Sequence, residues 1–311
     1  MSKKLISYGL WYDHQAEEAA RFYTSLFPGS KVNDILLYGK EGYEIHGGKE
    51  GTVMLAEFTL CGEKFVAING GPLFKFNPSI SFFVVFETVQ EADKVWNALT
   101  EGGKFLMPYQ KYDFSEKFGW VEDRYGLSWQ ISYGKISDVG QQLTPSFLFV
   151  GKQAGRAEDA INFYTSIFKN SKVDGIRKHP AGGKEPEGNV MHGQFGLSGQ
   201  KFMIMESVDS GHNFEFNEAV SIIINCDTQE EIDYYWTKLT AGGEESNCGW
   251  LKDKYGVSWQ VDSTELTKML KDKDEKKVQR VTKAFLQMKK YDIKKLKAAF
   301  QGKESPVLGT A

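Results

Sequence analysis

The chain has 311 residues, of which 41% are hydrophobic and 25% charged, and its net charge is −3. A domain typically holds roughly 100–200 residues, so this length predicts about two domains, and the composition excludes a fibrous or disordered chain. The charge is uneven, because residues 265–311 carry 13 Lys or Arg against 6 Asp or Glu, a net +7, which leaves −10 on residues 1–264. An acidic body argues against nucleic acid as the main partner.

The cellular location is predicted from two signals that the sequence lacks, a signal peptide and a membrane span. The N-terminal residues enter a strand pattern without the apolar core of a signal peptide, and no run approaches the ~18 apolar residues of a membrane span. The three cysteines, Cys61, Cys226 and Cys248, are too few for a disulfide framework. We therefore expect reduced thiols, a cytoplasmic protein and no membrane partner.

The chain repeats its own motifs. Phe22–Phe27 (FYTSLF) returns as Phe163–Phe168 (FYTSIF), and Tyr125–Gln130 (YGLSWQ) returns as Tyr255–Gln260 (YGVSWQ). A repeat in constant order indicates two copies of one domain. The expected division is a first domain over 1–137, a second over 143–264 and a basic helical extension over 265–311.

In the first copy, hydrophobic periodicity predicts a strand from Ser7 to Asp13 and a helix from Ala16 that Pro28 and Gly29 terminate. Three more strands should follow, at 32–38, 53–60 and 64–69. A second pass gives a strand from Ser79, a helix from Gln90 to Thr100 and three strands near 104–109, 118–123 and 127–133. Each copy thus contains two βαβββ units.

The second copy repeats this order after a linker at Lys135–Leu143. The extension adds two amphipathic helices, one with its apolar stripe at Val278, Val281, Phe285 and Met288 and one that Asp292 should cap. We interpret their lysines as a solvated outer face rather than as a surface that binds nucleic acid or membrane. The fold class expected is α+β.

Several motifs carry a resemblance to a known family. Leu10–Asp13, Phe22–Pro28 and Gly70–Pro72 in the first copy, with Phe214–Ser221 and Cys248–Val261 in the second, resemble the PhnB-like family, which also carries a demethylubiquinone methyltransferase name. That family belongs to the glyoxalase/bleomycin-resistance, or vicinal oxygen chelate, superfamily. The resemblance implies two tandem glyoxalase-like domains whose sheets curl around a concave ligand cavity.

The resemblance also implies where a metal would be held, namely by His, Gln or Glu on the first and last strands of paired units. The last-strand position falls on Gln130 and Gln260, but the first-strand and fifth-strand positions hold no His. An amide oxygen binds a hard cation less well than a carboxylate does. We therefore expect no metal and no cofactor, with a divalent metal as the alternative.

Two residues are candidates for catalysis. His192 shares a strand face with Gln194, and its counterpart in the first copy is Leu55; Cys248 could act as a nucleophile if its pKa were lowered. A structural His and an inert buried thiol are the simpler interpretations. Together with Trp250 and Gln260, these residues make the second copy the preferred site.

The expected ligand contacts are aromatic, with one amide in each copy. The residues predicted to bind the ligand are Trp11, Phe74, Phe76, Trp120, Gln130, Phe214, Phe216, Trp250 and Gln260. Aromatic faces beside an amide suit a planar or apolar small molecule in a preformed pocket. Trp129 and Trp259 point away from the glutamines and should lie in the core.

Three functional hypotheses remain open, and whether the chain is an enzyme is undecided. The preferred one is binding of a small, partly aromatic molecule without a catalytic metal. A second is a metal-dependent lyase, isomerase or dioxygenase in which Gln130 or Gln260 joins His192 and an acid such as Glu206. A third is a structural or dimerising module in which the duplication mimics a homodimer with shared sheets. No glycine-rich phosphate loop or dinucleotide motif is present, which weakens nucleotide-dependent chemistry and the methyltransferase name.

Overall fold

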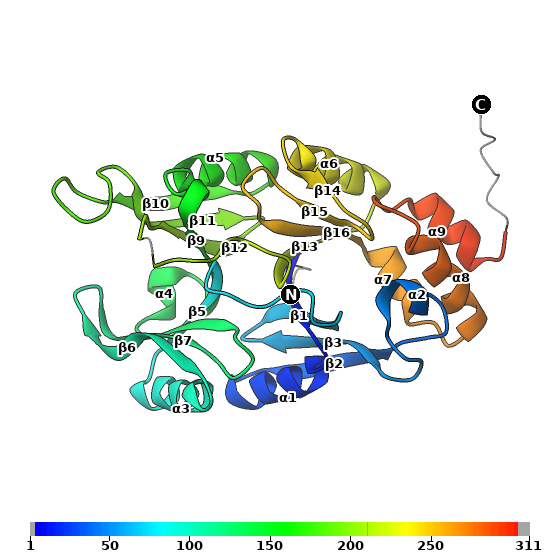
Figure 1. Ribbon diagram of the computed structural model, residues 1–311, viewed down its shortest axis with the longest axis horizontal. Helices are drawn as coiled ribbons and strands as arrows, with labels where there is room; N and C mark the ends of the chain where they lie inside the picture. The colour runs from blue at the N-terminus through cyan, green and yellow to red at the C-terminus, as the bar shows by residue number, and fades with distance from the viewer. Residues whose placement is uncertain (1–3, 210, 304–311) are drawn as a thin grey trace.

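The computed structural model describes residues 4–209 and 211–303; the first three residues and the end of the extension, 304–311, lie outside the described residues. Two eight-stranded sheets form the body, and Figure 1 shows how they lie between the helices. The first copy contributes β1 (Ile6–Tyr12), α1 (Ala16–Leu26), β2 (Lys31–Leu37), α2 (Tyr43–His46), β3 (Val53–Leu60), β4 (Glu63–Asn69), β5 (Ile80–Phe86), α3 (Val89–Thr100), β6 (Lys104–Tyr112), β7 (Ser115–Glu122) and β8 (Ser128–Tyr133). The second copy contributes β9 (Leu143–Phe149), η1 (Gly151–Gln153), α5 (Ala157–Ile167), β10 (Lys172–Lys178), β11 (Val190–Leu197), β12 (Gln200–Glu206), β13 (Val220–Cys226), α6 (Gln229–Thr240), β14 (Glu244–Glu245), β15 (Trp250–Lys252) and β16 (Ser258–Ser263).

Each sheet takes strands from both copies. Sheet A has the order β14-β15-β16-β13-β1-β4-β3-β2, and sheet B has the order β10-β11-β12-β9-β5-β8-β7-β6. The copies meet through antiparallel pairs, β1 with β13 and β5 with β9. The structure thus shows the sheets shared between copies that the third hypothesis described.

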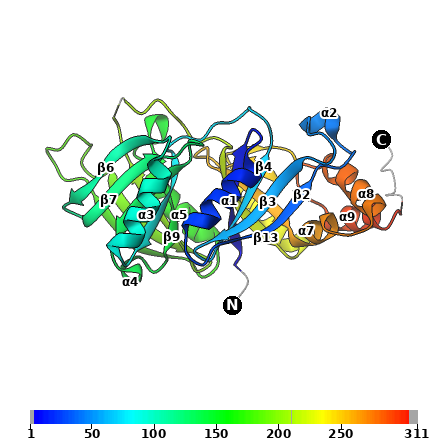
Figure 2. The same ribbon diagram turned by 90° about the horizontal axis from the view of Figure 1, so that it is seen from below.

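The four longer helices of the two copies, α1, α3, α5 and α6, lie on the outer side of the sheets. Figures 1 and 2 show α1 and α3 along one long side, with α5 and α6 along the other. α3 and α6 begin with the same device, because the hydroxyls of Thr88 and Thr228 accept from the backbone N–H groups of Glu91 and Glu231. None of the described helices is long and apolar enough to cross a membrane.

The repeated YGxSWQ motif builds the core of each copy. Asp253 is buried and accepts hydrogen bonds from Tyr164 Oη (2.7 Å), Trp259 Nε1 (2.9 Å) and the backbone N–H groups of Tyr255 and Val257. Asp123 repeats these contacts with Tyr23, Trp129, Tyr125 and Leu127. Trp129 and Trp259 are fully buried, as predicted.

Some short elements were not predicted. The helices α2 and α4 (Ile136–Val139) have only four residues each and end at glycines with left-handed backbone, so they carry no readable apolar period. β9 begins at Leu143 and takes the end of the predicted linker, while β10 is a largely exposed edge strand without alternation.

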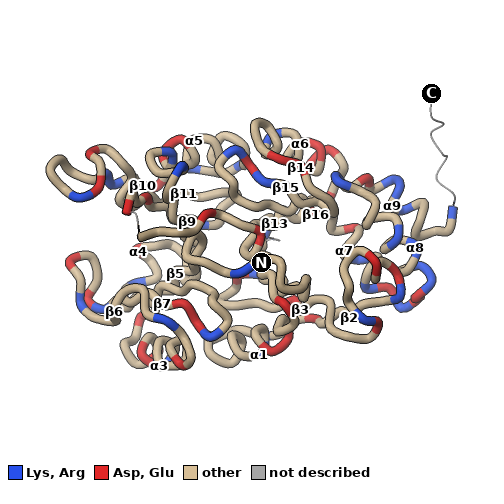
Figure 3. The backbone as a smooth tube through the Cα atoms, viewed as in Figure 1, with Lys and Arg blue, Asp and Glu red and all other residues tan. Residues whose placement is uncertain are grey.

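Up to residue 303, where the described part ends, the extension has three helices rather than two, α7 (Thr264–Leu270), α8 (Glu275–Phe285) and α9 (Ile293–Phe300). Asp292 caps α9 as expected, by accepting from the backbone N–H of Lys295. Figure 3 shows basic residues gathered on this end of the molecule. Lys271, just after α7, pairs with Glu57 (2.7 Å) and Asp34 (3.1 Å), so the extension reaches across to the first copy.

Candidate functional site

A cavity of about 920 Å³ lies on the inner face of sheet A. Strands β2, β3 and β4 of the first copy form one wall, and β13, β15 and β16 of the second copy form the other. Leu266 and Leu270 of α7, with Phe285 of α8, also line it, so the extension covers this face. Its size is within the ~300–1,000 Å³ typical of small-molecule pockets.

Gln260 on β16 lines the cavity. Its Nε2 donates a hydrogen bond to Ser221 Oγ on β13 (2.9 Å). The same Nε2 lies beside Gly9 on β1, in the space that a side chain at position 9 would fill. A Cβ at position 9 would lie 2.7 Å from that Nε2 and 2.3 Å from Ser221 Oγ, so glycine makes room for both side chains. The strands therefore bring a glycine, a serine and a glutamine to the position where the family resemblance implies a metal.

These residues do not fit a divalent metal. Gly9 offers no side-chain ligand, and Ser221 and Gln260 are already bonded to each other as neutral groups. Hard cations prefer carboxylates, and zinc prefers imidazole or thiolate. Within 4–209 and 211–303, no group of three or more His, Cys, Asp or Glu is arranged to hold a metal ion.

Sheet B contains the position that corresponds to Gln260 of sheet A. Gln130 Nε2 donates to Ser81 Oγ (2.8 Å), and Ser146 stands where sheet A has Gly9. His192 lies on β11 of this sheet and is half-buried; burial and the charge of Arg177 lower its pKa, which favours the neutral ring. His192 therefore does not lie with Cys248, Trp250 and Gln260, and the second copy does not form one site.

Glu206 does not complete a lyase site. Its carboxylate is buried and accepts from the backbone N–H groups of Ala157 at the start of α5 (2.6 Å) and Val190 (2.7 Å). Asn69 does the same for Ala16 in the first copy (2.8 Å). Glu206 thus anchors a helix, and the set proposed with His192 is not assembled in this structure.

Cys248 does line the cavity, but its chemistry is unfavourable for a nucleophile. Burial raises the pKa of its thiol to about 11, so the thiol stays protonated at neutral pH. Its backbone carbonyl accepts from Tyr291 Oη (2.7 Å), which fixes the extension to the entry of β15. Cys248 is therefore placed as a structural thiol.

The aromatic residues predicted to bind a ligand separate into two groups. Trp250 lines the cavity, and its ring meets Trp11 at 6.0 Å, which in turn meets Phe74 at 5.1 Å. Gly70 leaves the room for Trp11, since a Cβ there would lie 2.1 Å from the indole ring. These three rings form one aromatic cluster beside the cavity.

The other predicted aromatic residues lie elsewhere. Phe76 packs on Tyr12 (5.1 Å) and Phe216 on Phe149 (5.1 Å), so both rings are half-buried against core residues. Phe214 contacts His212 at 5.3 Å. Trp120 belongs to sheet B, where its Nε1 donates to Ser128 Oγ (2.7 Å).

Asp262 is a cavity residue that sequence reasoning missed. It follows Gln260 by two positions on β16 and shares its face, and Ser132 holds the equivalent place in the first copy. Burial, reinforced by the charge of Glu57, raises the pKa of Asp262 to about 6. The sequence signal that could have identified Asp262 as a cavity residue is the acid two positions after the repeated glutamine.

This pKa shift predicts how stability depends on pH. Between about pH 4, where an unfolded Asp ionises, and pH 6, the native carboxyl holds a proton that the unfolded chain has released. The free energy of unfolding should therefore fall as pH rises through this interval, and Asp262→Asn should raise it by about 2 kcal/mol at pH 7.5. Urea unfolding at pH 4.5 and 7.5 measures both effects. With exposed Asp138→Asn as control, an unchanged stability of Asp262→Asn at both pH values would contradict the placement.

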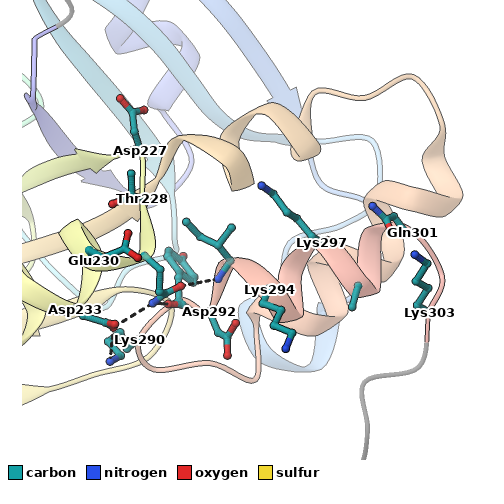
Figure 4. A pocket seen from close by; sticks show the side chains of 14 residues that line it. Asp227, Thr228, Glu230, Asp233, Lys290, Asp292, Lys294, Lys297, Gln301 and Lys303 are labelled. Carbon is teal, nitrogen blue, oxygen red and sulfur yellow. Dashed lines mark hydrogen bonds and ion pairs between the residues drawn. The ribbon is translucent and has the colours of Figure 1, made fainter.

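A second hollow, of about 940 Å³, lies between α6 and α9 (Figure 4). Its polar groups are engaged in holding the extension: Gln229 Oε1 accepts from the N–H of Ile293 (2.8 Å), and Lys290 Nζ lies 2.6 Å from Asp233 Oδ1. We interpret this hollow as the seam along which the extension docks on the second copy.

Comparison with known proteins identifies the family. The family described as 3-demethylubiquinone-9 3-methyltransferase matches this chain twice, over residues 4–132 and again over 141–262. The chain belongs to this family. No curated protein matches it.

Solved structures extend the relationship to the wider fold. A putative 3-demethylubiquinone-9 3-methyltransferase, PhnB protein, from Bacillus cereus is 43% identical over 41% of this chain and 98% of its own, with a TM-score of 0.38. A Staphylococcus aureus protein is 32% identical over 43% of this chain and 100% of its own, with a TM-score of 0.18. A point mutant of glyoxalase I from Zea mays, only 11% identical, covers 83% of this chain and 94% of its own with a TM-score of 0.53. This tandem member of the family thus has the glyoxalase-like fold that its motifs predicted.

Proposed function

We propose that this protein binds a small, partly aromatic molecule in the cavity of sheet A, without a catalytic metal. The observation that carries the proposal is the lining of that cavity, where the Trp250 ring and the Gln260 amide meet and the metal position holds only Gly9, Ser221 and Gln260. Apolar walls with a few convergent polar groups are typical of small-molecule sites. We place this function in the cytoplasm, in keeping with three cysteines that form no disulfide within residues 4–209 and 211–303.

The two halves of the cavity come from different copies, so both copies serve one site. Leu36, Met54 and Leu55 of the first copy form an apolar wall opposite Trp250 of the second. The extension lies over this wall, and its Lys271 is tied to Glu57 and Asp34. Such a site excludes water from much of the ligand and does not require a second chain.

Indole is a suitable first probe, because it offers an aromatic face and one hydrogen-bond donor. Trp250→Ala should weaken indole binding about tenfold, as expected for the loss of an aromatic pair and its buried area. Gln260→Ala should also weaken it. Ligand-observed NMR with the metal-free protein in EDTA measures the dissociation constant.

The equivalent residues of sheet B supply matched controls. Trp120→Ala and Gln130→Ala change the same residue types at the same places in the other sheet and should leave indole binding intact. If these variants lose binding while Trp250→Ala keeps it, the site is in sheet B. A requirement for an added divalent ion would support the metal-dependent alternative instead.

A further inference from the structure

Asp262 sets the chemical character of one end of the sheet A cavity. It lies two residues, or about 7 Å, along β16 from Gln260, the residue that pairs with Trp250. Its Oδ1 accepts from the backbone N–H of Ser263 (2.7 Å), and the carboxyl faces the cavity. Asn225 is its neighbour in register on β13.

The charges around Asp262 do not neutralise it. Glu57 is engaged with Lys271, Lys4 is bonded to Glu63, and Lys268 pairs with Glu265. Lys31 and Lys64 also line the cavity but are exposed at its rim. In the part of the chain that the structure describes, no Lys, Arg or His lies within ion-pair distance of Asp262.

The nearby hydroxyl and thiol do not supply a partner either. Tyr291 Oη is directed to the carbonyl of Cys248 (2.7 Å), and the Cys248 thiol points toward the carbonyl of Phe285 at 3.8 Å. Asp262 is half-buried, and removing a carboxylate even partly from water without a cation nearby is costly, so proteins normally pair such a group. The second copy nevertheless holds an acid where the first copy has Ser132.

We propose that the ligand of this cavity carries a protonated amine, which binds the Asp262 carboxylate while the aromatic part of the ligand lies against Trp250. This inference rests on the proposed function, since it specifies the ligand class for the same cavity. A charge-assisted hydrogen bond supplies the missing partner and also relieves the repulsion between Asp262 and Glu57.

Three indole derivatives that differ in charge test the inference: tryptamine, the neutral alcohol tryptophol, and the anion indole-3-acetate. Their dissociation constants are measured by ligand-observed NMR at pH 7.5 with the wild-type chain, Asp262→Asn and Trp250→Ala. Tryptamine should bind about tenfold more tightly than tryptophol, the range expected for a hydrogen bond to a charged group. Asp262→Asn should abolish that preference and leave tryptophol binding unchanged, and Asp138→Asn should change neither.

The outcomes separate the two proposals. If tryptophol or indole-3-acetate binds as well as tryptamine to the wild type and binding needs Trp250, the cavity is a binding site but the amine specificity is wrong. A preference for tryptamine that survives Asp262→Asn also overturns the inference, because another group then recognises the charge. If none of the three compounds binds, the proposed function fails together with the amine specificity.

Discussion

Residues 1–142, produced without the rest of the chain, should form a homodimer rather than a folded monomer. The fragment keeps β1–β4 and β5–β8 but loses β13 and β9, the strands that pair with β1 and β5. Because β5 of the first copy is equivalent to β13 of the second, two fragments can rebuild both sheets by pairing β1 of each with β5 of the other. Edges left open would expose unpaired backbone and apolar core.

Light scattering coupled to size-exclusion chromatography checks the mass, and urea unfolding at several protein concentrations checks the coupling of folding to association. The unfolding midpoint should rise with concentration for the fragment, since only the dimer completes the sheets. A fragment that unfolds cooperatively as a monomer, with a midpoint independent of concentration, would show that a copy can fold without sheet sharing.

Replacing Asp253 should be the most damaging single substitution in the second copy. Asp253→Ala leaves four buried donors without an acceptor, those of Tyr164, Tyr255, Val257 and Trp259. We expect the free energy of unfolding to fall by about 4 kcal/mol, because each unsatisfied buried donor costs on the order of 1–3 kcal/mol and some will relax. Thermal and urea unfolding measure the loss.

The repeat provides the matched comparison for this substitution. Asp123→Ala should cost a similar amount, because Asp123 receives the same four kinds of donor. Tyr164→Phe removes one of the bonds and should cost about 1 kcal/mol, which keeps the test informative if the Ala variant does not fold. A loss below 1 kcal/mol in Asp253→Ala would contradict the role of this network.

Asp253 and Asp262 lie in the same copy and illustrate why a sequence position alone does not predict stability. Asp253 has four donors, so its removal should destabilise the fold, whereas Asp262 has one backbone donor and should destabilise the fold by its presence at neutral pH. The difference arises from hydrogen bonding, because burial raises the pKa of both carboxyls.

Much of the local structure could be predicted because its signals are local. The helix that begins at Ala16 and the Asp292 cap of α9 each depend on residues within one or two turns. The repeat and the motif resemblance predicted the family and the glyoxalase-like fold, both of which the comparisons confirm. Short helices such as α2 could not be predicted, because they are too short to show a hydrophobic period.

The candidate site could be predicted only in part. Trp250 and Gln260 were named from the repeat and do lie at one cavity, but His192, from the same copy, lies in the other sheet. Because His192, Trp250 and Gln260 belong to one copy, we expected them to form one site. Each sheet, however, joins half of one copy to half of the other, so these residues lie in different sheets. Phe76 and Phe216 were taken as ligand contacts from their type, although their half-buried rings pack against core residues.

The sequence by itself determined that the chain is a duplication of two βαβββ units with a basic extension, because repeated motifs and apolar periods are written in the order of residues. Only the tertiary structure decided which units share a sheet. The sequences of β13 and β5 are similarly apolar, so the pattern of residues does not predict which of the two strands pairs with β1. Strand pairing brings Gln260 against Gly9, and residues of the extension line the same cavity as Asp262. The character of the cavity therefore depends on contacts between residues far apart in the chain.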